Sequence, residues 1–534
     1  MNKLFALFAA VSLLVAGCGD SGSGAAPTVP TSTLTVLAGS ELKDLTDPAL
    51  GNLADEILKA TGIELEFTFS GSLDAVDRIR SGEAYDAVWL SHGKYLALTP
   101  GVKEKILAQE KTMLSPVILA LKESKAKALG WADNPKVTWR DIAKAAEAGK
   151  IALAITNPAS SNTGFVAMVG LASALADKGD ALSVADIRTE KLAGFYKAQK
   201  LTSGSSGWLA EAYEREQDRL DGIVNYESVI LSLNAGNRLK EKLVPIYPQE
   251  GIITADYPLM LLNDTRRADY DKLIAYLRDA PFQQALMEKT LRRPVNPAVP
   301  PAPTFPKGLL VELPFPGSLE VIDALLTKFL SDIRNPGTAF FVVDTSGSMS
   351  SGNPSRMEMA KTALLGLLGD DTSITGRFAR FQPREHIHLL RFSGRIERTQ
   401  PFVLGVEPEK NRKVLQELRG QVEQLQPDGG TALFGAVAQA YREALESRAA
   451  QPGRYVTIVV LTDGQNTGNY KIEDFRAMHQ GLPADLRNIK VFPILFGEGN
   501  VSEMTELAQL TGGRTFDARK HALSQVFKDI RGYQ

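Results

Sequence analysis

The sequence predicts an α/β protein with parallel sheets that is divided into more than one domain. Three observations lead to this expectation. Strand-like and helix-like runs alternate over most of the chain, a proline-rich stretch interrupts them between residues 292 and 317, and a second alternating series follows it. With 534 residues, of which 44% are hydrophobic, the chain can bury two or three separate cores.

The first series begins with a strand over residues 34–40, LTVLAGS, which ends at Ser40. Helical apolar spacing follows, and IELEFTFSGS at 63–72 then alternates apolar and polar residues as a strand does. A helix is predicted from Asp74, and the next strand, DAVWL, ends at Ser91. This order of strand, helix and strand predicts a parallel α/β lobe.

The same rhythm continues to residue 263. Further elements are predicted in MLSPVILALKES (113–124), KIALAIT (150–156), a helix after NPASSNTG (157–164), DGIVNYESVI (221–230) and the apolar region 242–263. The Ser ending the first strand, the strand YDAVWLS, the turn ASSNTG and the pattern VNYES resemble the bilobal periplasmic solute-binding proteins, most nearly those for oxyanions such as molybdate or sulfate. The resemblance covers residues 33–292 and implies two crossings between the lobes, near 115–122 and 242–252.

Hydroxyl groups at predicted strand ends and helix starts are the candidate ligand groups of this domain. They belong to Ser40, Ser70, Ser72, Ser91, Ser161, Thr163 and Tyr226. Hydroxyls and backbone N–H groups at helix N-termini can hold a small anion. Each is also an ordinary helix cap, so only convergence on one cleft would favour ligand binding. The turn SGSSG at 203–207 either lines that cleft or forms a plain loop.

Proline is abundant in RRPVNPAVPPAPTFPKG, which breaks helices and central strands and marks a domain boundary. The next residues, SLEVIDALLTKFLSDI at 318–333, have apolar side chains at helical spacing interrupted by charges. We expect a packing helix there and assign 293–334 to the linker and this helix.

Oxygen-bearing side chains follow three apolar runs in the last part of the chain. FFVVDTSGSMSSG carries Asp344, Ser346 and Ser348, GGTALF carries Thr431, and VVLTDGQNTG carries Asp463. Hydroxyls and carboxylates are hard oxygen ligands that suit Mg²⁺, with Mn²⁺ as the alternative. Any one of these segments could instead be a tight turn or a helix cap.

The order DxSxS, Thr and Asp resembles the metal-ion-dependent adhesion site of von Willebrand factor A domains, over about residues 335–534. The resemblance implies a doubly wound, Rossmann-like sheet with the metal at the carboxyl ends of its strands. It also implies that an acidic side chain of a protein partner completes the metal's coordination. An aspartyl phosphatase is disfavoured, because its second acid would stand where Ser346 is.

Residues 1–17 combine an early Lys with a short apolar stretch and predict an export signal. Val-Ala-Gly-Cys resembles the lipobox of bacterial lipoproteins, so Cys18, the only cysteine, is the expected lipidation site. Residues 18–32 are Gly-, Ser- and Pro-rich and predict a flexible tether. Gly19, not Asp, follows this Cys, and the resemblance to diderm lipoproteins then implies the outer membrane if the host has one. No later stretch approaches the roughly 18 apolar residues of a membrane-spanning helix.

Basic and acidic residues nearly balance, 60 against 62, which disfavours nucleic acid as a partner. The sequence lacks HExxH, GxxxxGK[ST] and GxSxG motifs, His386 and His388 alternate as in a strand, and Glu227 has no evident acid–base partner. We therefore expect a non-enzymatic, lipid-anchored envelope protein that binds a protein partner through its metal, with ligand sensing by the N-terminal domain. The alternative is the substrate-binding component of an importer for an oxyanion or another small solute; a metal-assisted hydrolase is least favoured.

Overall fold

The structure of the chain is a computed structural model. It describes residues 30–176, 180–306, 310–463, 465–497, 499–520 and 522–534. The predicted signal, the lipidation site at Cys18 and most of the tether lie outside these ranges. Within them, no helix has both the length and the apolar character that crossing a bilayer requires.

The first lobe is a five-stranded sheet in the order β2-β1-β3-β11-β4, in which β1 runs parallel to β2 and β3. Its strands are β1 Ser32–Gly39, β2 Ile63–Ser70, β3 Ala87–Trp89, β4 Ala108–Lys111 and β11 Pro258–Leu261. Its helices are α1 Leu53–Thr61, α2 Ser72–Ser81, α3 Lys94–Leu98, α10 Arg267–Leu277 and α11 Ala280–Thr290. The predicted parallel α/β lobe is confirmed, with an antiparallel addition from β11 and β4.

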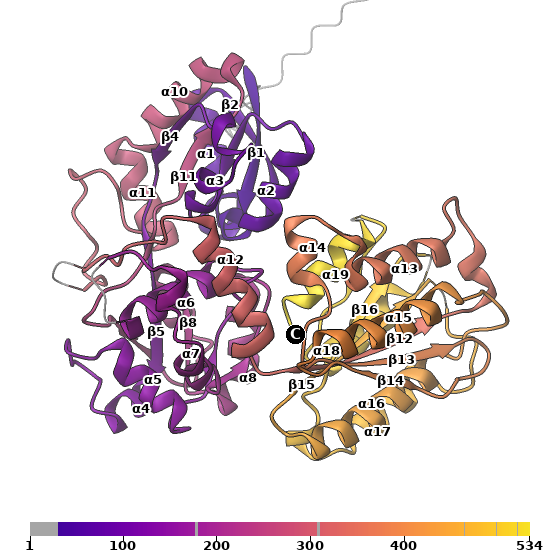
Figure 1. Cartoon of the computed structure of the whole chain (residues 1–534). Helices are drawn as coiled ribbons and strands as arrows, with labels where there is room; N and C mark the ends of the chain where they lie inside the picture. Colours follow the sequence, from indigo (N-terminus) through magenta and orange to yellow (C-terminus); the bar gives the residue numbers. More distant parts are fainter. Residues whose placement is uncertain (1–29, 177–179, 307–309, 464, 498, 521) are drawn as a thin grey trace, which may run out of the picture.

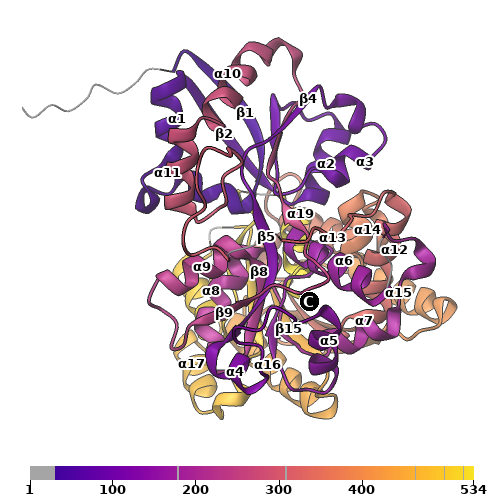
Figure 2. The ribbon, with the colours of Figure 1, turned by 90° about the vertical axis from the view of Figure 1, so that its left-hand side faces the viewer.

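The second lobe has the sheet order β10-β5-β8-β6-β7, with β9 paired to β5. Its strands are β5 Ser115–Lys122, β6 Leu153–Ala154, β7 Gln199–Leu201, β8 Gly222–Tyr226, β9 Leu243–Ile246 and β10 Thr254–Ala255. Its helices are α4 Glu123–Ala128, α5 Trp139–Glu147, α6 Asn162–Ala176, α7 Thr189–Tyr196, α8 Ser206–Glu216 and α9 Glu227–Ala235. Figures 1 and 2 show the two lobes one above the other.

The chain crosses between the lobes at residues 112–114 and 256–257, where it leaves one sheet and enters the other. The predicted crossings near 115–122 and 242–252 were therefore wrong by a few residues. The apolar run at 115–122 is β5, which pairs with β8, β9 and β10 inside the second lobe.

The linker packs against the N-terminal domain instead of standing away from it. Its helix α12, Leu319–Lys328, continues as a π-helical turn at Phe329–Ile333, and its apolar face is buried in that domain's core. The Phe315 ring stacks on His92 with ring centroids 4.6 Å apart. The predicted packing helix is confirmed.

The C-terminal domain is a six-stranded sheet in the order β14-β13-β12-β15-β16-β17, parallel except for β14. Its strands are β12 Gly337–Asp344, β13 His386–Phe392, β14 Gln400–Val403, β15 Tyr455–Thr462, β16 Lys490–Leu495 and β17 Phe516–Asp517. Its helices are α13 Arg356–Leu365, α14 Ile374–Ala379, α15 Pro408–Glu423, α16 Leu433–Ala450, α17 Ile472–Gln480, α18 Val501–Leu510 and α19 Leu523–Arg531.

Helices cover both faces of this sheet, which explains the continuous apolar sequence of β12. Phe340 and Val342 point into the core formed with α16, α17 and α18. Phe341 and Val343 point into the opposite core, formed with α13, α15 and α19. Because strand side chains alternate between faces, a strand buried on both sides has no polar alternation. The doubly wound arrangement expected from the sequence is confirmed.

The C-terminal domain contacts both lobes of the N-terminal domain (Figure 1). From the first lobe, the Asp77 carboxylate accepts the N–H groups of Ile374 and Thr375, at 2.9 and 2.8 Å, where α14 begins. From the second lobe, Glu216 forms a largely buried ion pair with Lys490 at 3.3 Å. The C-terminal domain therefore holds the two lobes in their relative position.

We expect the Asp77→Ala variant to weaken the contact between the first lobe and α14 by about 1–3 kcal/mol, because two N–H groups and one hydroxyl lose their charged acceptor. Hydrogen exchange of the peptide that contains Ile374 and Thr375 should become faster. Asp55→Ala, an exposed carboxylate of α1, is the matched control. Equal exchange in the wild type and both variants would contradict this role of Asp77.

Candidate functional site

The three predicted motif segments meet at the carboxyl edge of the C-terminal sheet. β12 ends at Asp344, and Asp463 follows the end of the adjacent parallel strand β15. The loop before Thr431 is held against the first segment, because the Gly347 N–H donates to the Gly429 carbonyl at 3.0 Å. Three segments that are well separated in sequence thus form one site.

Four of the five predicted side chains form one string of hydrogen bonds. The Ser346 N–H donates to Asp344 Oδ1 at 2.8 Å, and the Ser346 and Ser348 hydroxyl oxygens are 3.0 Å apart. The Ser348 hydroxyl donates to Asp463 Oδ1 at 2.9 Å. Thr431 is buried beside them, and the Thr467 hydroxyl accepts its N–H at 2.8 Å. Ser348 is exposed, so the string reaches the surface.

The charges of this site fit a divalent cation. Asp344 is fully buried, and burial raises its pKa to about 6 against the opposing hydrogen bonds from Ser346 and Thr462. Among the described residues, no cationic side chain pairs with it, whereas Asp463 pairs with the Arg356 guanidinium at 2.7 Å. An unpaired buried carboxylate beside several hydroxyls is a suitable oxygen set for Mg²⁺.

Hydroxyls are essential to this donor set. In the ranges that the structure describes, no three His, Cys, Asp or Glu side chains gather where a metal could bind. The candidate centre has only the two carboxylates of Asp344 and Asp463, so its other oxygens must come from Ser and Thr. Arg356, at the start of α13, was missed by the sequence analysis, because an Arg after a capping Ser carries no sign of a partner more than 100 residues away.

A cavity of about 680 Å³ lies between the two lobes and the C-terminal domain. Six of the seven hydroxyl residues predicted for the N-terminal ligand site line it: Ser40, Ser70, Ser72, Ser91, Ser161 and Tyr226. The Tyr226 hydroxyl accepts a hydrogen bond from Asn162 Nδ2 at 3.1 Å. Ser205 and Ser206 of the SGSSG segment also line the cavity, so this segment borders the cleft, and its last two residues begin α8.

Thr163 does not reach the cavity. Its side chain is fully buried, and its hydroxyl lies 2.9 Å from the hydroxyls of both Thr156 and Ser161. These bonds join the start of α6 to the segment that follows β6. The residue therefore belongs to a buried cluster of hydroxyls that fixes the start of α6.

Several charged residues of the cleft were missed by the sequence analysis. They are Glu41 and Lys43 in the first lobe, and Arg514 and Lys520 in the C-terminal domain. The last two could not be found by reasoning on the N-terminal domain alone, because they reach its cleft only through the packing of the two domains.

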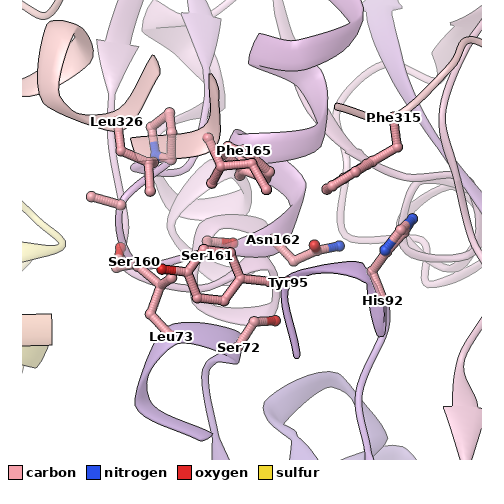
Figure 3. Close-up of a pocket in the computed structure, with 13 residues that line it drawn as sticks. Ser72, Leu73, His92, Tyr95, Ser160, Ser161, Asn162, Phe165, Phe315 and Leu326 are labelled. Atoms are coloured by element: carbon pink, nitrogen blue, oxygen red, sulfur yellow. The ribbon is translucent and has the colours of Figure 1, made fainter. Parts of the chain in front are cut away.

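Beside the main cleft is a smaller, largely apolar cavity of about 30 Å³ (Figure 3). Ser72 and Tyr95 approach it from the first lobe, and Ser160 and Phe165 from the second. His92 stacks on Phe315 at its edge, and burial lowers the His92 pKa to about 4. The linker therefore closes this side of the junction between the lobes.

His92 should make the protein sensitive to acid. Its ring stays neutral in the folded state until pH about 4, whereas the unfolded chain binds the proton near pH 6.5. The contribution of the neutral His92 ring to the free energy of unfolding is therefore complete above pH 6.5. It is lost as the pH falls toward 4, by about 1 kcal/mol per pH unit. In His92→Phe the decline of the melting temperature across this window should be shallower. An equal decline in His92→Phe and the wild type would show that residues other than His92 take up the protons.

The remaining titratable residues singled out in the sequence have structural surroundings. His386 and His388 lie in β13 as predicted, and His388 stacks on Phe340. Glu227 is buried and forms an ion pair with Arg293 at 2.6 Å.

Residues 34–290 match the family model of the bacterial extracellular solute-binding proteins, and residues 339–465 match that of the von Willebrand factor type A domain. These matches confirm a solute-binding domain followed by a von Willebrand factor type A domain, and with them the α/β fold class. No curated protein matches the sequence significantly.

Solved structures similar to this chain include the periplasmic binding protein AfuA from Actinobacillus pleuropneumoniae, at 13% identity, covering 57% of this chain and 99% of that one with a TM-score of 0.42. Another is the sulfate-binding protein SubI from Mycobacterium tuberculosis H37Rv, at 16% identity, 55% and 98% coverage and a TM-score of 0.40. These likenesses concern the fold alone.

Proposed function

We propose that this chain, which joins a bacterial solute-binding domain to a von Willebrand factor type A domain, is an exported, lipid-anchored envelope protein that binds a protein partner through Mg²⁺. The observation that supports this function is the convergence of Asp344, Ser346, Ser348 and Asp463, with Thr431 beside them, at one sheet edge. No enzymatic activity is part of the proposal.

In this function, the five residues hold the metal directly or through water. When bound, Mg²⁺ or Mn²⁺ supplies a positive centre that accepts an acidic side chain of the partner. The exposed Ser348 lies on the side from which a partner would approach.

The position of the centre leaves room for a partner. β15 begins beside the second lobe, where the Tyr455 hydroxyl donates to the Gln199 carbonyl at 2.5 Å. The strand then runs through eight residues to Thr462, and its seven rises of about 3.3 Å separate its ends by about 23 Å. The candidate centre is therefore at the end of the strand that points away from this interdomain contact.

An affinity capture from envelope extract tests the proposal. The full-length protein is used as bait in Mg²⁺ and in EDTA, with the Ser348→Ala variant in Mg²⁺ as a third arm. We expect an envelope protein to be retained only by the wild type in Mg²⁺. Identical captures in all three arms would refute partner binding through the metal.

Transport is the second candidate function, because the predicted hydroxyls gather in one cleft between two lobes. In this case the chain captures an oxyanion or another small solute for an importer. A bound solute raises the free energy of unfolding by RT ln(1 + [L]/Kd). Sulfate, molybdate and phosphate should then raise the melting temperature, and no shift with any of them would remove the support for oxyanion transport.

A further inference from the structure

The cleft between the lobes has a third wall that comes from the C-terminal domain. Its cavity of about 680 Å³ is bordered by Arg514, Phe516 and Lys520 as well as by residues of both lobes. A cavity of this size can enclose a small organic solute. A solute in this cavity would contact both lobes and the C-terminal domain.

The floor of the cleft offers an acceptor that lacks a donor. Glu41 folds back over Gly39, where a Cβ atom would lie only 2.6 Å from Glu41 Oε1. This oxygen is buried and has no hydrogen-bond partner in the described structure. Burial raises the Glu41 pKa, and the Ser91 hydroxyl and the Arg292 guanidinium oppose this only in part. An ammonium or another N–H group of a solute would supply the missing donor when the Glu41 side chain, which lines the cavity, turns from Gly39 toward it.

The C-terminal wall offers a fixed cation. The Arg514 guanidinium carbon lies 3.7 Å from the centre of the Trp208 ring of the second lobe, and 5.5 Å from that of Phe516. A guanidinium stacked in this way directs its N–H groups outward in its own plane, where they meet the Tyr533 hydroxyl and can also bind an anion. Lys43 is near enough that the positive charge of Arg514 adds to burial in lowering the Lys43 pKa.

The charges around the cleft balance. Four basic residues line it, Lys43, Arg78, Arg514 and Lys520, and four acidic ones, Glu41, Asp74, Asp517 and Asp529. Arg78 is paired with Asp74 at 2.8 Å. Asp517 is likewise paired, with Arg519 at 2.7 Å. A free oxyanion would meet the cations of the C-terminal wall but would leave the Glu41 oxygen without a donor. A solute with charges of both signs fits the walls better.

We propose that the cleft and the C-terminal domain form one composite site for a zwitterionic solute, with its ammonium group at Glu41 and its acidic group at Arg514. The inference rests on the proposed solute-binding role of this cleft. Because the solute contacts both domains, its binding also strengthens their contact, and the reverse holds by linkage.

The test uses the full-length protein and a series of ω-amino acids of increasing length: glycine, γ-aminobutyrate, ε-aminocaproate and ω-aminooctanoate. Hexanoate and hexylamine are the analogues with a single charge, and inorganic phosphate is the free oxyanion. We expect at least one ω-amino acid to bind about tenfold or more tightly than either single-charge analogue in calorimetry.

Variants then locate the two ends of the solute. Glu41→Gln and Arg514→Gln should each weaken binding about tenfold or more. Arg412→Gln removes the same charge from an exposed position of the same domain, outside the cavity lining, and should leave the affinity unchanged. If Arg514→Gln does not melt cooperatively, Lys520→Gln on the same wall replaces it, with a smaller expected loss of at least threefold.

Two results would overturn the proposal. Phosphate binding more tightly than every ω-amino acid would show that the cleft holds a solute of a different class, so that the proposed solute-binding role would stand. The absence of binding by any probe would refute the zwitterionic site, while the metal-dependent capture of a partner would be decided by its own experiment.

Discussion

The Asp344→Ala variant should lose the stabilisation that Mg²⁺ confers on the wild-type protein. Asp344 is buried without a cationic partner in the described structure, so it has the most to gain from a bound cation. At a Mg²⁺ concentration 100 times the dissociation constant, the wild type should gain about 2.7 kcal/mol in the free energy of unfolding. Without this carboxylate, three neutral hydroxyls and an Asp463 already paired with Arg356 remain, and we expect almost no gain.

Calorimetric melting of the full-length protein over a range of Mg²⁺ concentrations measures this effect. Asp485→Ala removes an exposed carboxylate from the same domain and should keep the wild-type response. The comparison also separates metal binding from folding, because in EDTA both variants should show the same melting transitions as the wild type. An equal Mg²⁺ response in Asp344→Ala and the wild type would remove the proposed metal site.

The C-terminal site was the part of the molecule most open to prediction from sequence. Its residues lie immediately after apolar strand runs, and parallel strands that end at the same edge must bring such residues together. This logic correctly placed Asp344 beside Ser346, Ser348 and Asp463. It could not find Arg356, because the ion pair with Asp463 depends on the direction in which α13 leaves its loop.

The N-terminal cleft was predicted only in part, for two physical reasons. Hydroxyls at strand ends reveal which edge of a lobe they occupy, and six of the seven do face one cavity. The sequence of one domain, however, holds no information on what packs over its cleft. The position of Arg514 in this cleft therefore could not be predicted. The lobe crossings were misplaced because an apolar run such as 115–122 predicts a strand without indicating which sheet it joins.

Glu385→Ala should be among the most destabilising single substitutions in this chain. Glu385 lies just before β13 with 2% of its surface exposed, and it binds two buried guanidiniums. Arg531 Nη2 donates to both its carboxylate oxygens, at 2.7 and 2.9 Å, and Arg334 donates to one of them. Although burial would raise the Glu385 pKa, Arg531 and Arg334 hold it below its ordinary value.

Removing the carboxylate leaves two like charges buried side by side without the negative side chain that balances them, although each keeps hydrogen bonds to carbonyl oxygens, and this costs about 3–5 kcal/mol. Urea unfolding followed by circular dichroism should show this loss in the transition of the C-terminal domain. Glu409→Ala, which breaks an exposed pair with Arg412, should change stability by less than about 0.5 kcal/mol. A loss below about 1 kcal/mol for Glu385→Ala would mean that water reaches the two guanidiniums.

Arg334 also lies in the segment between α12 and β12, which connects the two domains. The Glu385→Ala variant should therefore loosen this connection and speed proteolysis of that segment.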